Sequence, residues 1–100
     1  MKTTIIAMVA GSMLIISGAA LAAGDPAAGA EKSKGCASCH GAEGNGKVPL
    51  AGKESAYLEQ QLKDFRSGAR SNSMMNMMAA QLSDADIADL AAFFAAQTPN

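Results

Sequence analysis

The pentapeptide Cys36-Ala37-Ser38-Cys39-His40 constrains this chain more than any other stretch of its sequence. It reads C-x-x-C-H, which is the pattern for covalent attachment of a c-type haem. Two thiols three positions apart lie on one helical turn, so each can add to a vinyl group of the same porphyrin. His40 then lies beneath the iron and offers a neutral imidazole nitrogen as an axial ligand.

Four other uses of the two cysteines account for fewer of the residues. A thioredoxin-like pair normally lies near a βαβ unit, and the sequence shows no strand with clear alternation. A zinc ion requires about four ligands, whereas this chain has two cysteines and one histidine. Iron–sulfur clusters normally take four cysteines. A plain disulfide is chemically allowed in an exported protein, but it leaves His40 and the methionines without a role.

The first 22 residues have the form of a secretory signal. Lys2 provides a positive charge, 5–16 is an apolar run, and Ala20-Leu21-Ala22 is an A-x-A-type cleavage site. We therefore expect residues 1–22 to be removed and the mature domain to be 23–100, exported to the periplasm. An uncleaved membrane anchor is the alternative, although the apolar run is shorter than the roughly 20 residues that a spanning helix needs.

The composition beyond the signal agrees with a small domain that depends on a cofactor. Without Lys2, seven of the eight basic side chains remain against nine acidic ones, a net charge of −2. This weak acidity excludes a basic nucleic-acid footprint and predicts little attraction to anionic lipid. A chain this short builds a marginal apolar core and usually needs a cross-link or metal. A porphyrin bonded to two cysteines would supply both the cross-link and part of the core.

Helical periodicity and end signals predict an all-α fold. An Asp-Pro pair precedes a helix over 27–34 that runs toward the cysteines. Ser55 to Ser67 carries apolar residues at helical spacing, with Ser55 as its cap and Gly68 as its stop. Ser83 and Asp86 are spaced like a capping box at the start of the last helix.

Two stretches lack a helical pattern and are predicted to be loops. Residues 41–52 contain four glycines and a proline, and 69–81 holds four methionines within five positions. Because His40 is the single histidine, the second axial ligand of a low-spin iron is expected to be a methionine sulfur from 74–78. The other methionines are expected to pack as flexible gap-fillers.

These features together resemble class I cytochromes c. The resemblance is carried by Cys36–His40, by the glycine loop with Leu50-Ala51-Gly52, and by Met75 followed by Leu82-Ser83-Asp84. It extends from Gly24 to Gln97 and is similar to small bacterial single-haem members and to the half-units of two-haem relatives. It implies a compact all-α fold of three to four helices around one covalently bound haem c.

The resemblance also implies roles for single residues. The axial methionine of the family lies eight positions before the serine that opens the last helix, which here is Met75, and Met78 is the runner-up. A proline carbonyl commonly accepts the N–H of the haem histidine, and Pro49 is the candidate. Gly29 is expected to pack against Phe93 near the haem. Candidates to pair with the haem propionates are Lys53, Arg66 and Arg70, with solvated surface charge as the alternative.

The implied function is electron transfer without catalysis. We expect a soluble periplasmic carrier that passes one electron between respiratory redox partners, such as a membrane cytochrome complex, a terminal oxidase or a reductase. No nucleic acid and no stable membrane insertion after signal cleavage are expected. The alternatives are a haem enzyme or gas sensor with a labile sixth ligand, a haem-free thiol–disulfide protein, and an electron-transfer subunit of a larger oxidoreductase complex.

Overall fold

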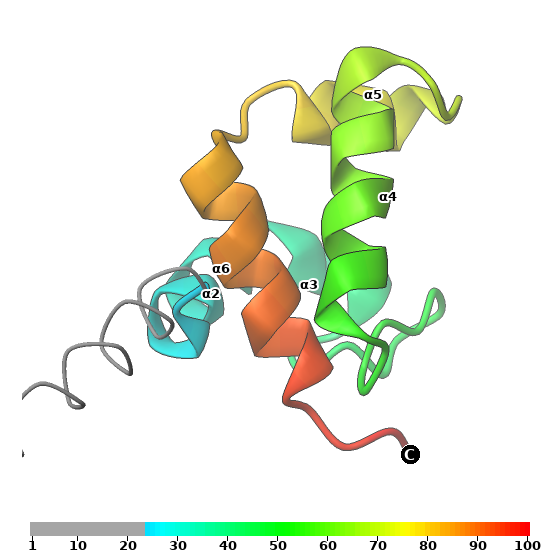
Figure 1. The fold of residues 1–100 in the computed structure, drawn as a ribbon. Coiled ribbons are helices and arrows are strands. Elements are labelled where there is room, and N and C mark those ends of the chain that lie inside the picture. Colours follow the sequence, from blue (N-terminus) through cyan, green and yellow to red (C-terminus); the bar gives the residue numbers. More distant parts are fainter. Residues whose placement is uncertain (1–23) are drawn as a thin grey trace, which may run out of the picture.

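The computed structural model describes residues 24–100, and this part of the chain contains helices and no strands (Figure 1). Helix α2 (Pro26–Lys32) continues through the 3-10 segment η2 (Ser33–Cys36) into α3 (Ala37–His40), so these elements form one helical arm. Helices α4 (Ser55–Ser67), α5 (Ser73–Ala79) and α6 (Asp84–Ala95) follow. The predicted all-α fold is thereby confirmed.

The expected signal at 1–22 lies outside the described residues. Within 24–100, each helix is too short or too polar to cross a bilayer.

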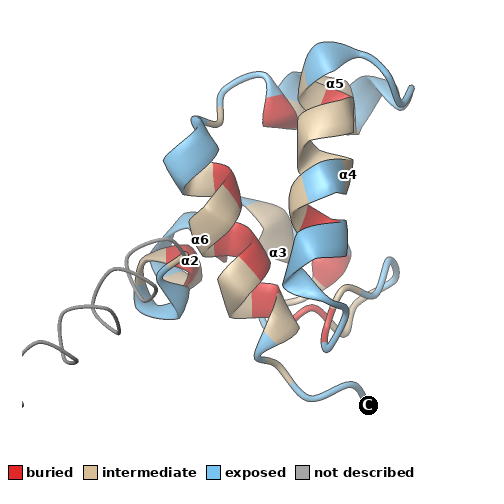
Figure 2. Cartoon of the chain, in the orientation of Figure 1, coloured by how far each residue is buried: buried red, intermediate tan, exposed pale blue. Residues whose placement is uncertain are grey.

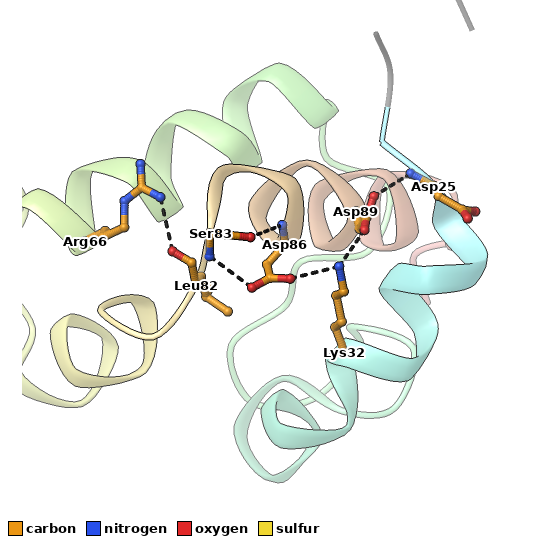
Figure 3. Close-up of polar contacts among 7 residues, drawn as sticks. All are labelled: Asp25, Lys32, Arg66, Leu82, Ser83, Asp86 and Asp89. Atoms are coloured by element: carbon orange, nitrogen blue, oxygen red, sulfur yellow. Dashed lines mark hydrogen bonds and ion pairs between the residues drawn. The ribbon is translucent and has the colours of Figure 1, made fainter. Parts of the chain in front are cut away.

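Most helix ends lie where the sequence signals place them. The Asp25 carboxylate caps α2 by accepting a hydrogen bond from the backbone N–H of Ala27 at 3.0 Å. Ser83 and Asp86 form the predicted capping box of α6, with reciprocal hydrogen bonds of 3.0 and 2.9 Å (Figure 3). Helix α4 ends at Gly68, whose φ of 88° is the left-handed conformation that favours glycine.

Two local predictions are wrong. Much of the methionine-rich stretch is helix α5, begun by Asn72, whose side chain accepts a hydrogen bond from the Met75 N–H at 3.0 Å. Asparagine is a good N-cap, and methionine and alanine are good helix formers. The helix has only 7 residues, however, which is shorter than the window of about 11–18 residues over which a helical period can be recognised. Ser55 does not cap α4; it is the first helical residue, and Glu54 holds the N-cap position without a side-chain bond.

Helix α2 crosses α6 at backbone contact distance. A Cβ atom at Gly29 would lie 2.0 Å from the Asp89 carbonyl oxygen and 2.7 Å from the Cβ of Phe93. Real carbon atoms cannot approach so closely, so glycine is required at this crossing. The structure therefore places Gly29 directly against Phe93, the pair that the resemblance brings together.

Ion pairs reinforce the same crossing (Figure 3). The Lys32 ammonium lies 2.8 Å from an Asp86 carboxylate oxygen and 2.6 Å from one of Asp89. The other Asp89 oxygen accepts the backbone N–H of Asp25 at 2.8 Å. Both ends of α2 are thus fastened to α6.

The second face of α6 packs toward α4. In Figure 2, buried residues follow this face of α6 and recur on α4. The cluster that joins the two helices is Leu58, Leu90, Ala91 and Phe94. Helix α4 also contacts α5, which packs near its carboxyl end (Figure 1).

Candidate functional site

A cavity of about 520 Å³ opens among the helical arm, the 41–52 loop, α4, α5 and α6. This volume falls within the range of about 300–1,000 Å³ that is typical of ligand and cofactor sites. The apolar residues of its wall include Leu58, Leu62, Phe65, Leu90 and Phe94. The cavity is therefore suited to a large apolar group that replaces missing core.

The two cysteines of the motif both line this cavity, and both are free thiols. Cys36 ends η2 and is half-buried, whereas Cys39 lies in α3 and is exposed. Burial raises the pKa of the Cys36 thiol. The junction between η2 and α3 thus presents two free thiols along one wall.

His40 is the last residue of α3 and is buried against the cavity. Its Nδ1 lies 2.7 Å from the Val48 carbonyl oxygen. Because a carbonyl oxygen only accepts hydrogen bonds, Nδ1 carries a proton, so in the neutral ring the lone pair is on Nε2. The local structure therefore fixes the neutral tautomer that can ligate a metal through Nε2.

The carbonyl that holds His40 belongs to Val48 and not to Pro49, so the expectation for Pro49 is wrong by one position. The loop register is set by two further bonds: Gly46 N–H donates to the His40 carbonyl at 2.7 Å, and Val48 N–H donates to that of Cys39 at 3.3 Å. Pro49 lines the cavity, and a proline restricts the residue before it to extended conformations. Its contribution is thus to the direction of the Val48 carbonyl.

The charged candidates divide into two groups. Lys53 and Arg70 line the cavity, and the Arg70 guanidinium lies 4.7 Å from the centroid of the Phe65 ring. Arg66 is not part of the cavity wall; it donates to the Leu82 carbonyl at 3.1 Å (Figure 3) and to the Asp84 carboxylate at 2.7 Å. This pairing ties α4 to the start of α6 and favours the alternative of a surface charge for Arg66 over a propionate partner.

Phe93 is also outside the cavity wall, because its side faces α2, while the adjacent Phe94 lines the cavity. Phe94 was not among the site residues predicted from the sequence. The signal was present: Phe94 continues the apolar stripe of α6, whereas Phe93 lies beside it. The Val48 carbonyl was missed because a backbone acceptor leaves no side-chain pattern.

Three of the four clustered methionines line the cavity. Met75 and Met78 are half-buried there, whereas Met74 is 56% exposed at its edge. Met77 is 59% exposed and is not part of the described wall. Two half-buried thioether sulfurs, those of Met75 and Met78, are therefore available on the cavity face of α5.

Comparison with known proteins agrees with this arrangement. Residues 26–97 match the family described as Cytochrome c. The chain is 45% identical over 86 residues to cytochrome c4 of Pseudomonas aeruginosa, covering 82% of this chain and 43% of that protein. It is 44% identical over 82 residues to cytochrome c-554(548) of Halomonas halodenitrificans, covering 75% of this chain and 99% of that protein.

The fold comparison gives the same result. Reduced recombinant cytochrome c4 from Pseudomonas stutzeri superposes with a TM-score of 0.73 at 36% identity, over 78% of this chain and 48% of that chain. The present chain thus spans about half the length of the cytochromes c4 that it matches. It belongs to the cytochrome c family, and that membership implies a covalently bound haem c.

The residues of the cavity fit such a group. Two free thiols lie on one short helical segment, the next residue is a histidine whose Nδ1–H is held by a backbone carbonyl, and the wall behind them is mostly apolar. When bound, haem c supplies an iron that can gain and lose one electron.

Proposed function

We propose that this chain is a periplasmic electron-transfer protein with one haem c, bonded through Cys36 and Cys39 and ligated by His40. The observation that carries the proposal is the shared cavity, whose wall contains both free thiols and the oriented imidazole. The electron would pass to and from redox proteins such as a membrane cytochrome complex, a terminal oxidase or a reductase. The chain binds and orients the redox group and excludes water from it, without transforming a substrate.

We further propose Met75 as the sixth ligand. Met75 is half-buried on the cavity face of α5, and its backbone N–H is held by the Asn72 cap. Met78 has a packing role instead, because its terminal methyl lies toward Gly35, within 3.9 Å of where a Cβ atom would be. A thioether ligand opposite an imidazole raises the reduction potential, which suits an acceptor in a respiratory chain.

The edge of the cavity offers a surface for a redox partner. Val48, Tyr57 and Met74 belong to the cavity wall, yet each is about half exposed, at 51%, 49% and 56%. They come from the loop, α4 and α5 respectively, so the apolar residues gather around one opening. Contact of a partner there would exclude water from the path of the electron.

The central experiment is production of the protein in a host with working export and haem-ligation systems. Addition of each thiol S–H across a vinyl double bond loses no atoms, so the mature chain should gain the mass of one intact haem. The c-type absorption should survive extraction with acidified acetone. A chain whose mass equals that of its amino acids alone would contradict the proposal.

The sixth ligand has its own test within that preparation. The ferric protein should show the sulfur-to-iron charge-transfer band, and Met75→Ala should abolish it while Met78→Ala preserves it. Loss of the band in Met78→Ala instead would move the assignment to Met78. Rapid, complete binding of carbon monoxide by the reduced wild-type protein near neutral pH would favour a haem enzyme or gas sensor.

A further inference from the structure

Asn76 lies in the middle of the methionine cluster and makes three hydrogen bonds with its side chain. Its Nδ2 donates to the Phe65 carbonyl at 2.7 Å and to the Arg70 carbonyl at 2.9 Å. Its Oδ1 accepts the backbone N–H of Asn72 at 2.9 Å. Two acceptors surround one end of the amide and a donor faces the other, so the partners themselves distinguish nitrogen from oxygen.

These hydrogen bonds connect α5 to the end of α4 and to the turn that follows α4. The Phe65 carbonyl is among the last four of α4, which have no acceptor role within their own helix. The Arg70 carbonyl belongs to the turn after α4, and Asn72 is the N-cap of α5. A single side chain thus fastens the start of α5 to the end of α4.

Because the Asn76 side chain is bonded to α4, it sets the rotation of α5 about its own axis and therefore which side of α5 faces the cavity. Successive residues of an α-helix are separated by about 100°. Residues 74, 75, 78 and 79 line the cavity, whereas Asn76 and Met77 are outside its described wall. Because Asn76 is directed toward α4, the preceding Met75 is turned toward the cavity.

We propose that Asn76 is a positioning residue, whose amide holds α5 in the rotation that presents the Met75 sulfur to the haem iron. This inference rests on the proposed function, because it requires Met75 to be the sixth ligand. Asn72 supports the same geometry from the other side, since its side-chain Oδ1 accepts the Met75 N–H. The pair of amides therefore fixes both the start and the rotation of the helix.

The test compares Asn76→Ala with Asn45→Ala in haem-loaded protein. Asn45 is a matched control because it also bridges two segments, donating to the Thr98 carbonyl at 3.0 Å and accepting from the Asn100 N–H at 3.1 Å. Asn76→Ala should weaken the sulfur-to-iron band and strengthen binding of added imidazole to ferric protein by about tenfold, the lower end of the scale expected when three hydrogen bonds are lost. Asn45→Ala should lower the unfolding midpoint but leave the band and the imidazole affinity unchanged.

If Asn76→Ala does not fold, a second variant provides the test. Asn76→Asp keeps the shape and the acceptor oxygen but loses both donated bonds, so it should shift imidazole binding in the same direction. Wild-type band strength and imidazole affinity in a folded Asn76 variant would overturn the inference while Met75 stays the ligand. If Met75→Ala keeps the band, the ligand assignment itself fails, and the role of Asn76 fails with it.

Discussion

Adjacent phenylalanines on α6 belong to regions that are packed in opposite ways. Phe93 and Phe94 meet edge to face, with ring centroids 5.0 Å apart and planes at 69°. Phe93 faces the crossing with α2, where backbone meets backbone at Gly29 and ion pairs join the helices. Phe94 faces a cavity of about 520 Å³. The crossing is completed by the chain alone, whereas the cavity side requires a cofactor to complete its core.

The largest expected effect is removal of the thiols that anchor the cofactor. Cys36→Ala combined with Cys39→Ala should remove most of the stability of the domain, about 5 kcal/mol, because the cavity wall loses the group that it packs against. Hydrogen exchange should show that amides of α4 and α5 lose protection before those of α2 and α6. Equal unfolding midpoints for the variant and the haem-bound protein would contradict this ordering.

The crossing of α2 and α6 can be broken by one methyl group. Gly29→Ala places a Cβ atom against backbone that cannot move independently, so we expect a loss of about 2–4 kcal/mol in the free energy of unfolding. That corresponds to a fall of roughly 10–20 °C in Tm for a domain of this size. Thermal unfolding of the haem-bound protein measures the effect.

Gly35→Ala is the matched control for this substitution. The nearest atom to a Cβ at Gly35 is the Met78 methyl at 3.9 Å, an ordinary contact distance. Its Tm should stay within a few degrees of the wild type. A similar loss in both variants would show that helical glycine in general, and not the crossing, determines the effect.

The ion pairs of the crossing predict a smaller, pH-dependent effect. Lys32 donates a hydrogen bond that lowers the pKa of Asp86 from its usual 3.8 to about 2, with a further contribution from Ser83. Stability from this carboxylate is present above pH 4 and is lost as pH falls toward 2. Asp86 and then Asp89 raise the pKa of Lys32 above its usual 10.5, so the ammonium contributes fully below that pH and less as pH rises beyond it.

Lys32→Met tests this account through the pH dependence of the unfolding midpoint. The variant should lose less stability than the wild type between pH 4 and 2, because its Asp86 lacks the ammonium partner. Asp84 serves as an internal control, since Arg66 lowers its pKa independently of Lys32. An unchanged acid transition in Lys32→Met would show that Asp86 is held chiefly by Ser83.

The sequence predicts the crossing better than it predicts the cavity wall. The capping box of Ser83 and Asp86 is a local signal, the contact of Gly29 with Phe93 is implied by the resemblance, and the structure contains both. Helix α5 escaped prediction because its 7 residues are fewer than the window of about 11–18 residues over which a helical period can be recognised. The tie between Asn76 and the end of α4 depends on a turn whose path the sequence leaves open.

The site shows the same division. C-x-x-C-H identifies its three residues from covalent chemistry alone, and the structure brings all of them to one cavity. The sequence leaves Arg66 open between a propionate partner and surface charge, because a charge does not identify its partner, which here is Asp84 across the α4–α6 contact. A backbone acceptor such as the Val48 carbonyl depends on loop register, which two hydrogen bonds to Cys39 and His40 set only after the chain folds.

The smallest expected effect concerns the residue that directs this carbonyl. Pro49→Ala should cost about 0.4–1 kcal/mol, because the unfolded chain gains freedom and Val48 is no longer restricted to extended conformations. The hydrogen bond from His40 Nδ1 to Val48 should weaken, and the imidazole then donates less electron density to the iron. Ferric iron benefits more from that donation, so the reduction potential should rise. Redox titration measures the potential, and thermal unfolding measures the stability. The matched control is Lys47→Ala, which changes the residue on the other side of Val48 and should leave the potential unaltered. A lowered potential in Pro49→Ala would show that the proline strains the hydrogen bond between His40 and Val48 instead of supporting it.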